Sequence, residues 1–222
     1  MADGPDIARI ATLIADPARA RMLTALMAGH ALTAGELAAE AGITPQTASG
    51  HLARLAEGGL IATARQGRHR YVRLAGSDVA EMLEALMELV DRRGPTRTRP
   101  GPREPGMRAA RICYDHLAGE RGVDLHDRLV ASGLLDPALV PSARGMAVFE
   151  GLGIDMATLG TARRPLCRAC LDWSERRTHL AGGLGAALFT AFEDRGWLRR
   201  RPGSRLVELP RTDPLARWLA AL

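Results

Sequence analysis

The sequence contains neither lysine nor asparagine, so all 30 of its basic side chains are arginine. Both missing residues have AT-rich codons, and a GC-rich genome is the simplest explanation of their absence. Every cation is therefore a planar guanidinium that stays charged and can bind phosphate or guanine through two parallel hydrogen bonds. The formal net charge of +5 and the pI near 10.0 favour a polyanionic partner only weakly, because +5 is a small charge for 222 residues.

Aromatic residues are scarce at 4%, there are only three cysteines, and no apolar run is long enough to cross a membrane. An odd number of cysteines argues against a disulfide-stapled secreted domain. The first residues lack a signal-peptide pattern, so we expect a cytoplasmic chain without a membrane partner. A hydrophobic content of 46% excludes global disorder, and the length predicts one large domain or two small ones.

The clearest break in the chain is the segment RRGPTRTRPGPREPGM, which starts at Arg92 and is rich in proline and glycine. Such a composition is typical of a linker. We therefore predict a first domain over residues 1–92, a linker over 93–107 and a second domain over 108–222. The first domain has nine arginines against 11 acidic residues, so a nucleic-acid surface within it has to be local.

Hydrophobic periodicity predicts four helices, a β-hairpin and a fifth helix in the first domain. The signals include an Asp-Pro helix start at Asp16, a capping box of Thr33 with Glu36, and a glycine stop at Gly42. The hairpin strands are expected at residues 60–65 and 69–74, and the last helix at 78–91. This order is that of a winged helix-turn-helix.

The fourth helix and the hairpin form a candidate DNA-reading surface. The helix starts with short polar side chains that allow close approach to a groove floor, and glutamine can pair with adenine. Residues 44–73 hold five arginines against a single glutamate, so positive charge is concentrated there. The candidate DNA-binding residues are Thr44, Gln46, Thr47, Ser49, Gly50, His51 and Arg54 of the helix, and Arg65, Arg68, His69 and Arg70 of the hairpin.

The segments DPARARMLTALM (residues 16–27) and ITPQTASGHLARLAEGGLIATARQGRHRYVRL (43–74) resemble the ArsR/SmtB family of winged helix-turn-helix transcriptional regulators. The resemblance implies a homodimeric repressor that an effector releases from an inverted-repeat operator. It also implies a dimer face formed by residues 7–14 and 79–90. Many members of that family sense metals through cysteines on the third helix or histidines on the last one. The corresponding helices here have no cysteine and no histidine, so we expect no metal at the usual family positions.

In the second domain we predict helices at residues 108–117, 125–132, 144–152, 156–163 and 184–195, and a short helix after Asp172. The tail ALFTAFEDRGWLRRRPGSRLVEL repeats the helix, hairpin and helix order of the first domain, which predicts a second winged-helix-like unit. The fold class is therefore mainly α with short β-hairpins (α+β). The segment PLCRACLDWSERRTHLAGGLGAAL also resembles the C-terminal extension of longer ArsR-type regulators, a resemblance that assigns no chemistry.

A possible effector or redox site is marked by Cys113, His116, Cys167, Cys170, Trp173 and His179. Four interpretations remain open. The cysteines could be small buried hydrophobic residues, the set could line an organic-ligand pocket, or the C-x-x-C pair could be a redox switch. The fourth is a metal site at Cys113/Cys167/Cys170, either a three-thiolate site for As(III) or a similar thiophile, or a zinc site that His116 or His179 completes. The sequence favours this metal site least, and we expect no required cofactor.

No catalytic motif accompanies these residues, so we expect a regulator and no enzyme. A thiol-disulfide redox protein would place Cys167 and Cys170 at a helix start after a strand, and no strand pattern precedes them. A protein-interaction module without DNA readout is the other alternative, against which the polar face of the fourth helix argues. The expected partners are double-stranded DNA, a second copy of the chain and a small-molecule or thiol-reactive effector that acts at the second domain.

Overall fold

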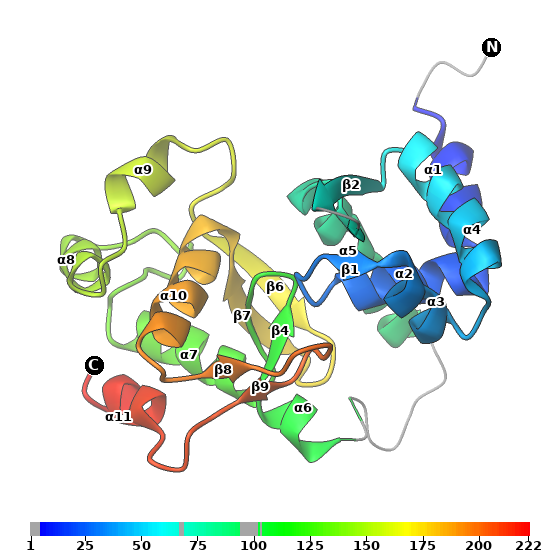
Figure 1. Cartoon of the computed structure of the whole chain (residues 1–222). Coiled ribbons are helices and arrows are strands. Elements are labelled where there is room, and N and C mark those ends of the chain that lie inside the picture. The colour runs from blue at the N-terminus through cyan, green and yellow to red at the C-terminus, as the bar shows by residue number, and fades with distance from the viewer. Residues whose placement is uncertain (1–4, 67–68, 94–101, 103) are drawn as a thin grey trace. The chain divides into compact units, whose positions relative to one another are not determined.

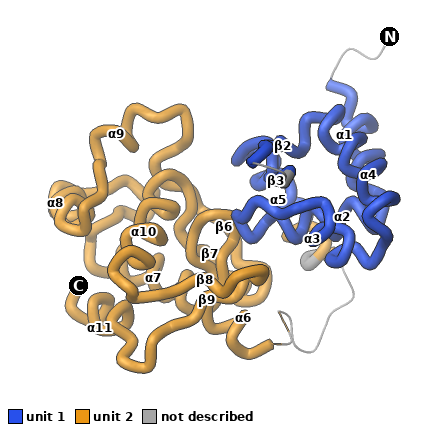
Figure 2. The backbone as a smooth tube through the Cα atoms, in the orientation of Figure 1, with its two compact units in different colours: residues 1–86 blue, residues 87–222 orange. Residues whose placement is uncertain are grey.

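A computed structural model describes residues 5–66, 69–93, 102 and 104–222. The chain divides into two compact units, residues 1–86 and residues 87–222, and each is described here by itself (Figure 2). The division falls within the helix that we expected to close the first domain at residue 92. Within the described residues, no helix is long and apolar enough to span a membrane.

The first unit has the predicted winged helix-turn-helix order (Figure 1). Its elements are α1 (Ile7–Ile14), α2 (Pro17–Leu26), β1 (Leu32–Thr33), α3 (Ala34–Ala41), α4 (Pro45–Glu57), β2 (Ile61–Gln66), β3 (His69–Leu74) and α5 (Ser77–Arg93).

Local sequence signals explain where these helices start and stop. The Asp16 carboxylate accepts hydrogen bonds from the backbone N–H groups of Ala18 and Arg19 at the start of α2. Thr33 and Glu36 form the predicted capping box at the start of α3. Gly42 ends α3 with φ 67°, a left-handed conformation that glycine adopts without steric cost and that turns the chain towards α4.

The wing is a three-stranded antiparallel sheet in the order β1-β3-β2. Ile61 pairs with Leu74 and Leu32 pairs with Val72, which fixes the register of both strand pairs. The buried ends of these strands join a core made by α2, α3, α4 and α5, whose fully buried members include Met22, Leu23, Leu37, Leu55 and Leu74. The core packing therefore fixes the position of α4, whose polar surface stays exposed.

The second unit contains three short antiparallel hairpins among six helices of the described chain. Its elements are α6 (Pro105–Ala109), β4 (Arg111–Cys113), β5 (His116–Ala118), α7 (Glu120–Ala131), α8 (Ala143–Gly151), α9 (Met156–Thr161), β6 (Arg168–Asp172), β7 (Arg177–Ala181), α10 (Gly182–Asp194), β8 (Arg199–Arg200), β9 (Val207–Glu208) and α11 (Pro214–Ala220). Phe149, Phe189 and Phe192 are fully buried in its core.

Two predicted helices of this unit are wrong, because hairpins replace them. Residues 108–117 were expected to be helical, but Cys113 and His116 pair across the turn of the β4–β5 hairpin. The short helix expected after Asp172 is instead the turn and second strand of the β6–β7 hairpin. Tyr114 and Arg176 have positive φ angles of 59° and 54° in these turns. Tight turns of this kind separate strands of only three to five residues, too short for their period to be recognised.

The predicted linker is also shorter than expected. Arg93 is the last residue of α5, and Pro105, Gly106 and Met107 are the first three residues of α6. The remaining linker residues 94–101 and 103 lie outside the described residues. Proline at the first position of a helix is favoured because its missing N–H has no partner there. Pro105 therefore starts a helix within a segment whose composition indicated a linker.

The tail of the second unit has the predicted order of helix α10, hairpin β8–β9 and helix α11. The hairpin does not stand free, because the N–H of Ile112 in β4 donates to the Arg205 carbonyl and that of Val207 donates to the Ala110 carbonyl. The second winged-helix-like unit thus has the expected elements, but its hairpin is part of the packing around β4. Its likeness to a DNA-binding wing stays a prediction.

Candidate functional site

Helix α4 presents a polar surface on one side and packs on the other. Ala48, Leu52 and Leu55 are buried. Their positions three and four residues apart place them on one side of the helix. Gln46, two residues before Ala48, and Ser49, one residue after it, are exposed. The polar residues of the first turn of α4 are therefore exposed to a binding partner, while the apolar residues of the helix pack into the core.

The side chains at the start of α4 are held in place by local hydrogen bonds. The Thr44 hydroxyl accepts from the Thr47 backbone N–H at 3.2 Å and contacts the Thr47 hydroxyl at 2.9 Å. The Ser49 hydroxyl donates to the Pro45 carbonyl at 3.0 Å. The N-terminal end of a helix carries partial positive charge, so this end is suited to an anionic group.

In the wing, Arg65 of β2 and Arg70 of β3 are cross-strand partners, and both are exposed. The Arg70 guanidinium donates to the Thr63 hydroxyl at 3.4 Å. His69 is the first residue of β3, and Arg68 lies outside the described residues. The hairpin therefore carries two exposed arginines, Arg65 and Arg70, away from its buried Ile61–Leu74 end.

A second cluster of chemically active side chains lies inside the second unit. Cys113, His116, Cys170 and His179 are all buried, and one ligand atom of each lies within 4.8 Å of the others. The cluster combines two cross-strand pairs: Cys113 with His116 on β4–β5, and Cys170 with His179 on β6–β7. Strands β5 and β7 are in contact, so the two hairpins bring their pairs together.

Two carboxylates lie behind the histidines of this cluster. The Nδ1 atom of His116 is 3.2 Å from Asp115 Oδ1, and Arg164 holds the same carboxylate through both of its oxygens. The Nδ1 atom of His179 is 3.8 Å from Asp172 Oδ2 and has no hydrogen-bond partner. The Nε2 atoms of the two histidines face one another at 3.0 Å.

Asp172 is the anchor of a buried charged network. Its Oδ1 accepts from the Arg111 guanidinium at 2.5 Å, its Oδ2 accepts from the Gly119 N–H at 2.7 Å, and the Ser174 hydroxyl donates to it at 2.8 Å. Burial opposes ionisation, but the positive charge of Arg111, the charge of His179 when its ring is protonated, and these hydrogen bonds lower the pKa of Asp172 to about 2. The network joins β4, the start of α7 and the β6–β7 hairpin.

The cluster also changes the acidity of its own members. Hydrogen bonding with Cys170, and then with His116 and His179, lowers the pKa of the Cys113 thiol well below its ordinary value although the residue is buried. Burial lowers the pKa of His179, which favours the neutral imidazole. A metal binds the thiolate form of cysteine and the neutral form of histidine, so the shifts of Cys113 and His179 both favour metal binding.

Comparison with known proteins places the chain among transcriptional regulators. A helix-turn-helix domain family matches residues 14–64. The chain is 40% identical over 215 residues to the uncharacterized HTH-type transcriptional regulator YdfF of Bacillus subtilis, a match that covers 96% of this chain and 95% of that protein.

This chain belongs to the HTH-type transcriptional regulators. The regulator is also 38% identical to CmtR of Mycobacterium tuberculosis over 84 residues, which cover 38% of this chain and 70% of CmtR. Among solved structures, the homodimeric DNA-binding domain of Mb0332 from Mycobacterium bovis, described as a possible ArsR-family regulator, is 28% identical. It covers 45% of this chain and 98% of that one, with a TM-score of 0.39. The prediction of a winged helix-turn-helix regulator is confirmed.

Most of the predicted helix residues lie on the exposed surface of α4, but His51 does not. Gln46, Thr47, Gly50 and Arg54 are exposed. The Nδ1 atom of His51 lies 3.4 Å from the Arg19 guanidinium and 3.7 Å from the Asp16 carboxylate, at the start of α2. Its side chain is therefore turned to the protein in this structure.

The regulator also has a buried arginine that the sequence did not indicate. Arg19 donates to the carbonyls of Leu13 at 2.5 Å and Thr12 at 2.8 Å, and so caps the C-terminal end of α1. No periodic or motif signal marks such a residue, because its role depends on where α1 ends relative to α2.

The predicted effector residues divide into two groups in the structure. Cys113, His116, Cys170 and His179 come together, whereas Cys167 is not part of the cluster. Cys167 is half-buried, and burial raises the pKa of its thiol to about 11. The proposed ligand set Cys113/Cys167/Cys170 is therefore wrong in one member. Trp173 stacks on the Arg111 guanidinium at 5.2 Å and contributes to packing around the charged network.

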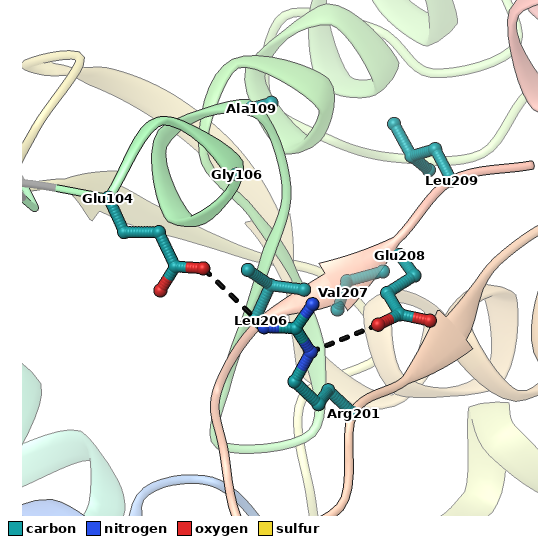
Figure 3. Close-up of a pocket in the computed structure, with 8 residues that line it drawn as sticks. All are labelled: Glu104, Gly106, Ala109, Arg201, Leu206, Val207, Glu208 and Leu209. Atoms are coloured by element: carbon teal, nitrogen blue, oxygen red, sulfur yellow. Dashed lines mark hydrogen bonds and ion pairs between the residues drawn. The ribbon is translucent and has the colours of Figure 1, made fainter. Parts of the chain in front are cut away.

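A surface pocket of about 470 Å³ lies elsewhere in the second unit, between α6 and the β8–β9 hairpin (Figure 3). Arg201 lies in it between two carboxylates, 3.5 Å from Glu104 and 3.0 Å from Glu208. Arg200 is paired with Glu193 in the same way. These hairpin arginines are thus matched by acidic groups of their own unit.

Proposed function

We propose that the regulator is a homodimeric repressor that binds an inverted-repeat operator and is released by a signal received at its second unit. The observation that carries the DNA-binding part is the start of α4. There, exposed Gln46 and Thr47 sit on a helix whose opposite side is fully packed.

Base readout is assigned to Gln46, Thr47, Ser49 and Gly50, because short polar groups at the N-terminal end of a recognition helix can reach the major-groove floor. Phosphate contacts are assigned to Thr44, Arg54, Arg65 and Arg70, all of which are exposed. Phosphate contacts fix the position of a protein on the duplex, and base contacts set its sequence preference. Substitutions in the two groups of residues should therefore have different effects on DNA binding. We keep Arg68, His69 and His51 as secondary candidates for contacts with the DNA phosphate backbone.

Unpartnered apolar residues support the homodimer. None of the residues of α1 is buried, and Ile7 is 81% exposed. Near the end of α5, Leu89 is 44% exposed and Val90 is 70% exposed. Exposed apolar helix surfaces are typical of protein interfaces. A second copy of the chain would cover them symmetrically, as a two-fold operator requires.

The signal is assigned to the second unit, since the third and last helices of the first unit offer no cysteine or histidine. CmtR of Mycobacterium tuberculosis is described as a cadmium metal-sensor, but its sequence match covers only 38% of this chain. An organic ligand or a thiol-reactive compound is the proposed effector, acting in the cytoplasm on the DNA-bound dimer.

The test is fluorescence anisotropy with operator and unrelated duplexes at stated salt, because phosphate contacts make affinity strongly salt-dependent. Gln46→Ala is expected to lower operator affinity by roughly 5- to 150-fold, the equivalent of about 1–3 kcal/mol for a lost base contact, and to leave non-specific binding unchanged. Arg65→Ala should weaken both duplexes alike and reduce the salt slope by about one. Thr24→Ala, an exposed threonine on α2, is the control. Equal binding of both duplexes by the native protein would refute the proposal.

A further inference from the structure

We propose that Cys113, His116, Cys170 and His179 form a closed site for one Zn²⁺ ion, which joins the β4–β5 and β6–β7 hairpins. The site goes beyond the DNA-binding proposal and does not depend on it. Two thiolates and two imidazoles with tetrahedral spacing are the donor set that zinc prefers, and four protein ligands leave no open position.

The backbone explains why these four side chains converge. In an antiparallel hairpin, residues directly opposite one another project to the same face of the sheet. Cys113 faces His116, and Cys170 faces His179. Each hairpin therefore offers one sulfur and one nitrogen, and the contact between β5 and β7 places the two pairs against each other.

The distances agree with a common ion. The four ligand atoms lie within 4.8 Å of one another, and the two Nε2 atoms are 3.0 Å apart. Zinc–nitrogen bonds of about 2.0–2.1 Å with tetrahedral angles separate two nitrogens by roughly 3.3 Å, and zinc–sulfur bonds of about 2.3 Å separate two sulfurs by roughly 3.8 Å. Small shifts of the side chains are enough to reach both values.

Hydrogen bonding around the histidines favours the tautomer that binds metal. A zinc-bound Nε2 requires the proton on Nδ1, where a carboxylate usually accepts it. His116 Nδ1 lies 3.2 Å from Asp115, and His179 Nδ1 faces Asp172 at 3.8 Å. The two Nε2 atoms face one another at 3.0 Å, and the His179 Nδ1 atom is buried without a hydrogen-bond partner.

Charge balance points the same way. Zinc binds both sulfurs as thiolates, with any proton still on a sulfur released to solvent, and the two thiolates would neutralise the two positive charges of the ion. The loaded site is therefore neutral, which suits a cluster whose four side chains are all buried.

Gly122 and Gly185 let α7 and α10 approach the cluster closely. A Cβ at Gly122 would lie 3.6 Å from His179 Cβ, and one at Gly185 would lie 3.4 Å from His116 Cβ.

The test measures the metal content of the full chain by native mass spectrometry and elemental analysis, then removes the metal with a chelator and adds Zn²⁺ or Co²⁺ alone. We expect one zinc per chain and, with Co²⁺, the intense visible absorption of tetrahedral cobalt with thiolate ligands. Cys113→Ser and Cys170→Ser should each lose tight binding and change the cobalt spectrum. Cys167→Ser is the matched control and should keep both, because Cys167 lies outside the cluster.

Alkylation keeps the proposal testable if the ligand variants fail to fold. In the native protein, zinc should protect Cys113 and Cys170 from a thiol reagent, and chelation should expose them. A reduced chain that binds neither ion would overturn the proposal. A Cys113–Cys170 disulfide in freshly purified protein would overturn it in favour of a redox site, and loss of metal in Cys167→Ser would show that the ligand set is different.

Discussion

Replacement of Arg111 by methionine should destabilise the second unit severely. Arg111 and Asp172 are each 1% exposed, and their ion pair at 2.5 Å joins β4 to β6. The variant keeps much of the aliphatic stem but leaves the Asp172 carboxylate buried without its cation. Breaking a buried pair in this way costs about 3–5 kcal/mol. At roughly 3–5 °C per kcal/mol for a unit of this size, the Tm should fall by roughly 10–20 °C.

The assay is thermal and urea unfolding followed by tryptophan fluorescence. The chain has three tryptophans, Trp173, Trp197 and Trp218, and all lie in the second unit, so the signal reports on that unit alone. The matched control is Arg128→Met. Arg128 pairs with Asp124 at 2.8 Å, but their side chains are 46% and 39% exposed, so its loss should cost less than about 1 kcal/mol.

A double variant measures the interaction energy between Arg111 and Asp172 separately from the contacts that each makes with other residues. Arg111→Met with Asp172→Leu removes both charges, so it should be more stable than the sum of the two single effects predicts, with a coupling of about 0.5–3 kcal/mol. If Arg111→Met costs no more than Arg128→Met, or if the two single effects simply add, the buried ion pair is not what stabilises this unit.

Two further predictions concern close packing and helix capping. In Gly185→Ala the new Cβ would lie 2.5 Å from the Leu180 carbonyl oxygen, so overpacking of about 1–3 kcal/mol should outweigh the gain of at most about 1 kcal/mol in helix propensity. Gly151→Ala, which meets nothing within 4 Å, should be neutral or stabilising in the same fluorescence assay, and equal effects would contradict the packing argument. Thr44→Ala should cost the first unit about 1 kcal/mol in urea unfolding followed by circular dichroism, since the Thr47 N–H loses its acceptor; an unchanged midpoint would show that this cap contributes nothing.

The first unit was predictable because its signals are local. Helix caps at Asp16, Thr33 and Thr44, and the positive φ of Gly42, set the ends of elements through residues at most four apart. Periods of 3.6 and 2 then distinguish its helices from the wing. The sequence left open whether His51 contacts phosphate or packs internally, because its position depends on Arg19, 32 residues away.

The second unit was less predictable because its strands are short and its contacts are long-range. Cys113 and His116 have a spacing that fits one helical turn as well as a tight hairpin, so the period could not distinguish the two. Cys167 and Cys170 suggested a pair by spacing alone. In an extended chain, residues three apart face opposite sides, and only Cys170 faces the cluster. The pairing of two hairpins across more than 50 residues cannot be derived from spacing.

Sequence-specific DNA binding through α4 can be measured as a footprint on the DNA upstream of the regulator's own gene. We predict protection of an inverted repeat with half-sites about 10–10.5 base pairs apart, or a multiple of that spacing, at moderate salt. Gln46→Ala combined with Thr47→Ala should abolish the footprint without unfolding the protein. Uniform protection of all DNA, or a footprint that survives this double variant, would contradict the account.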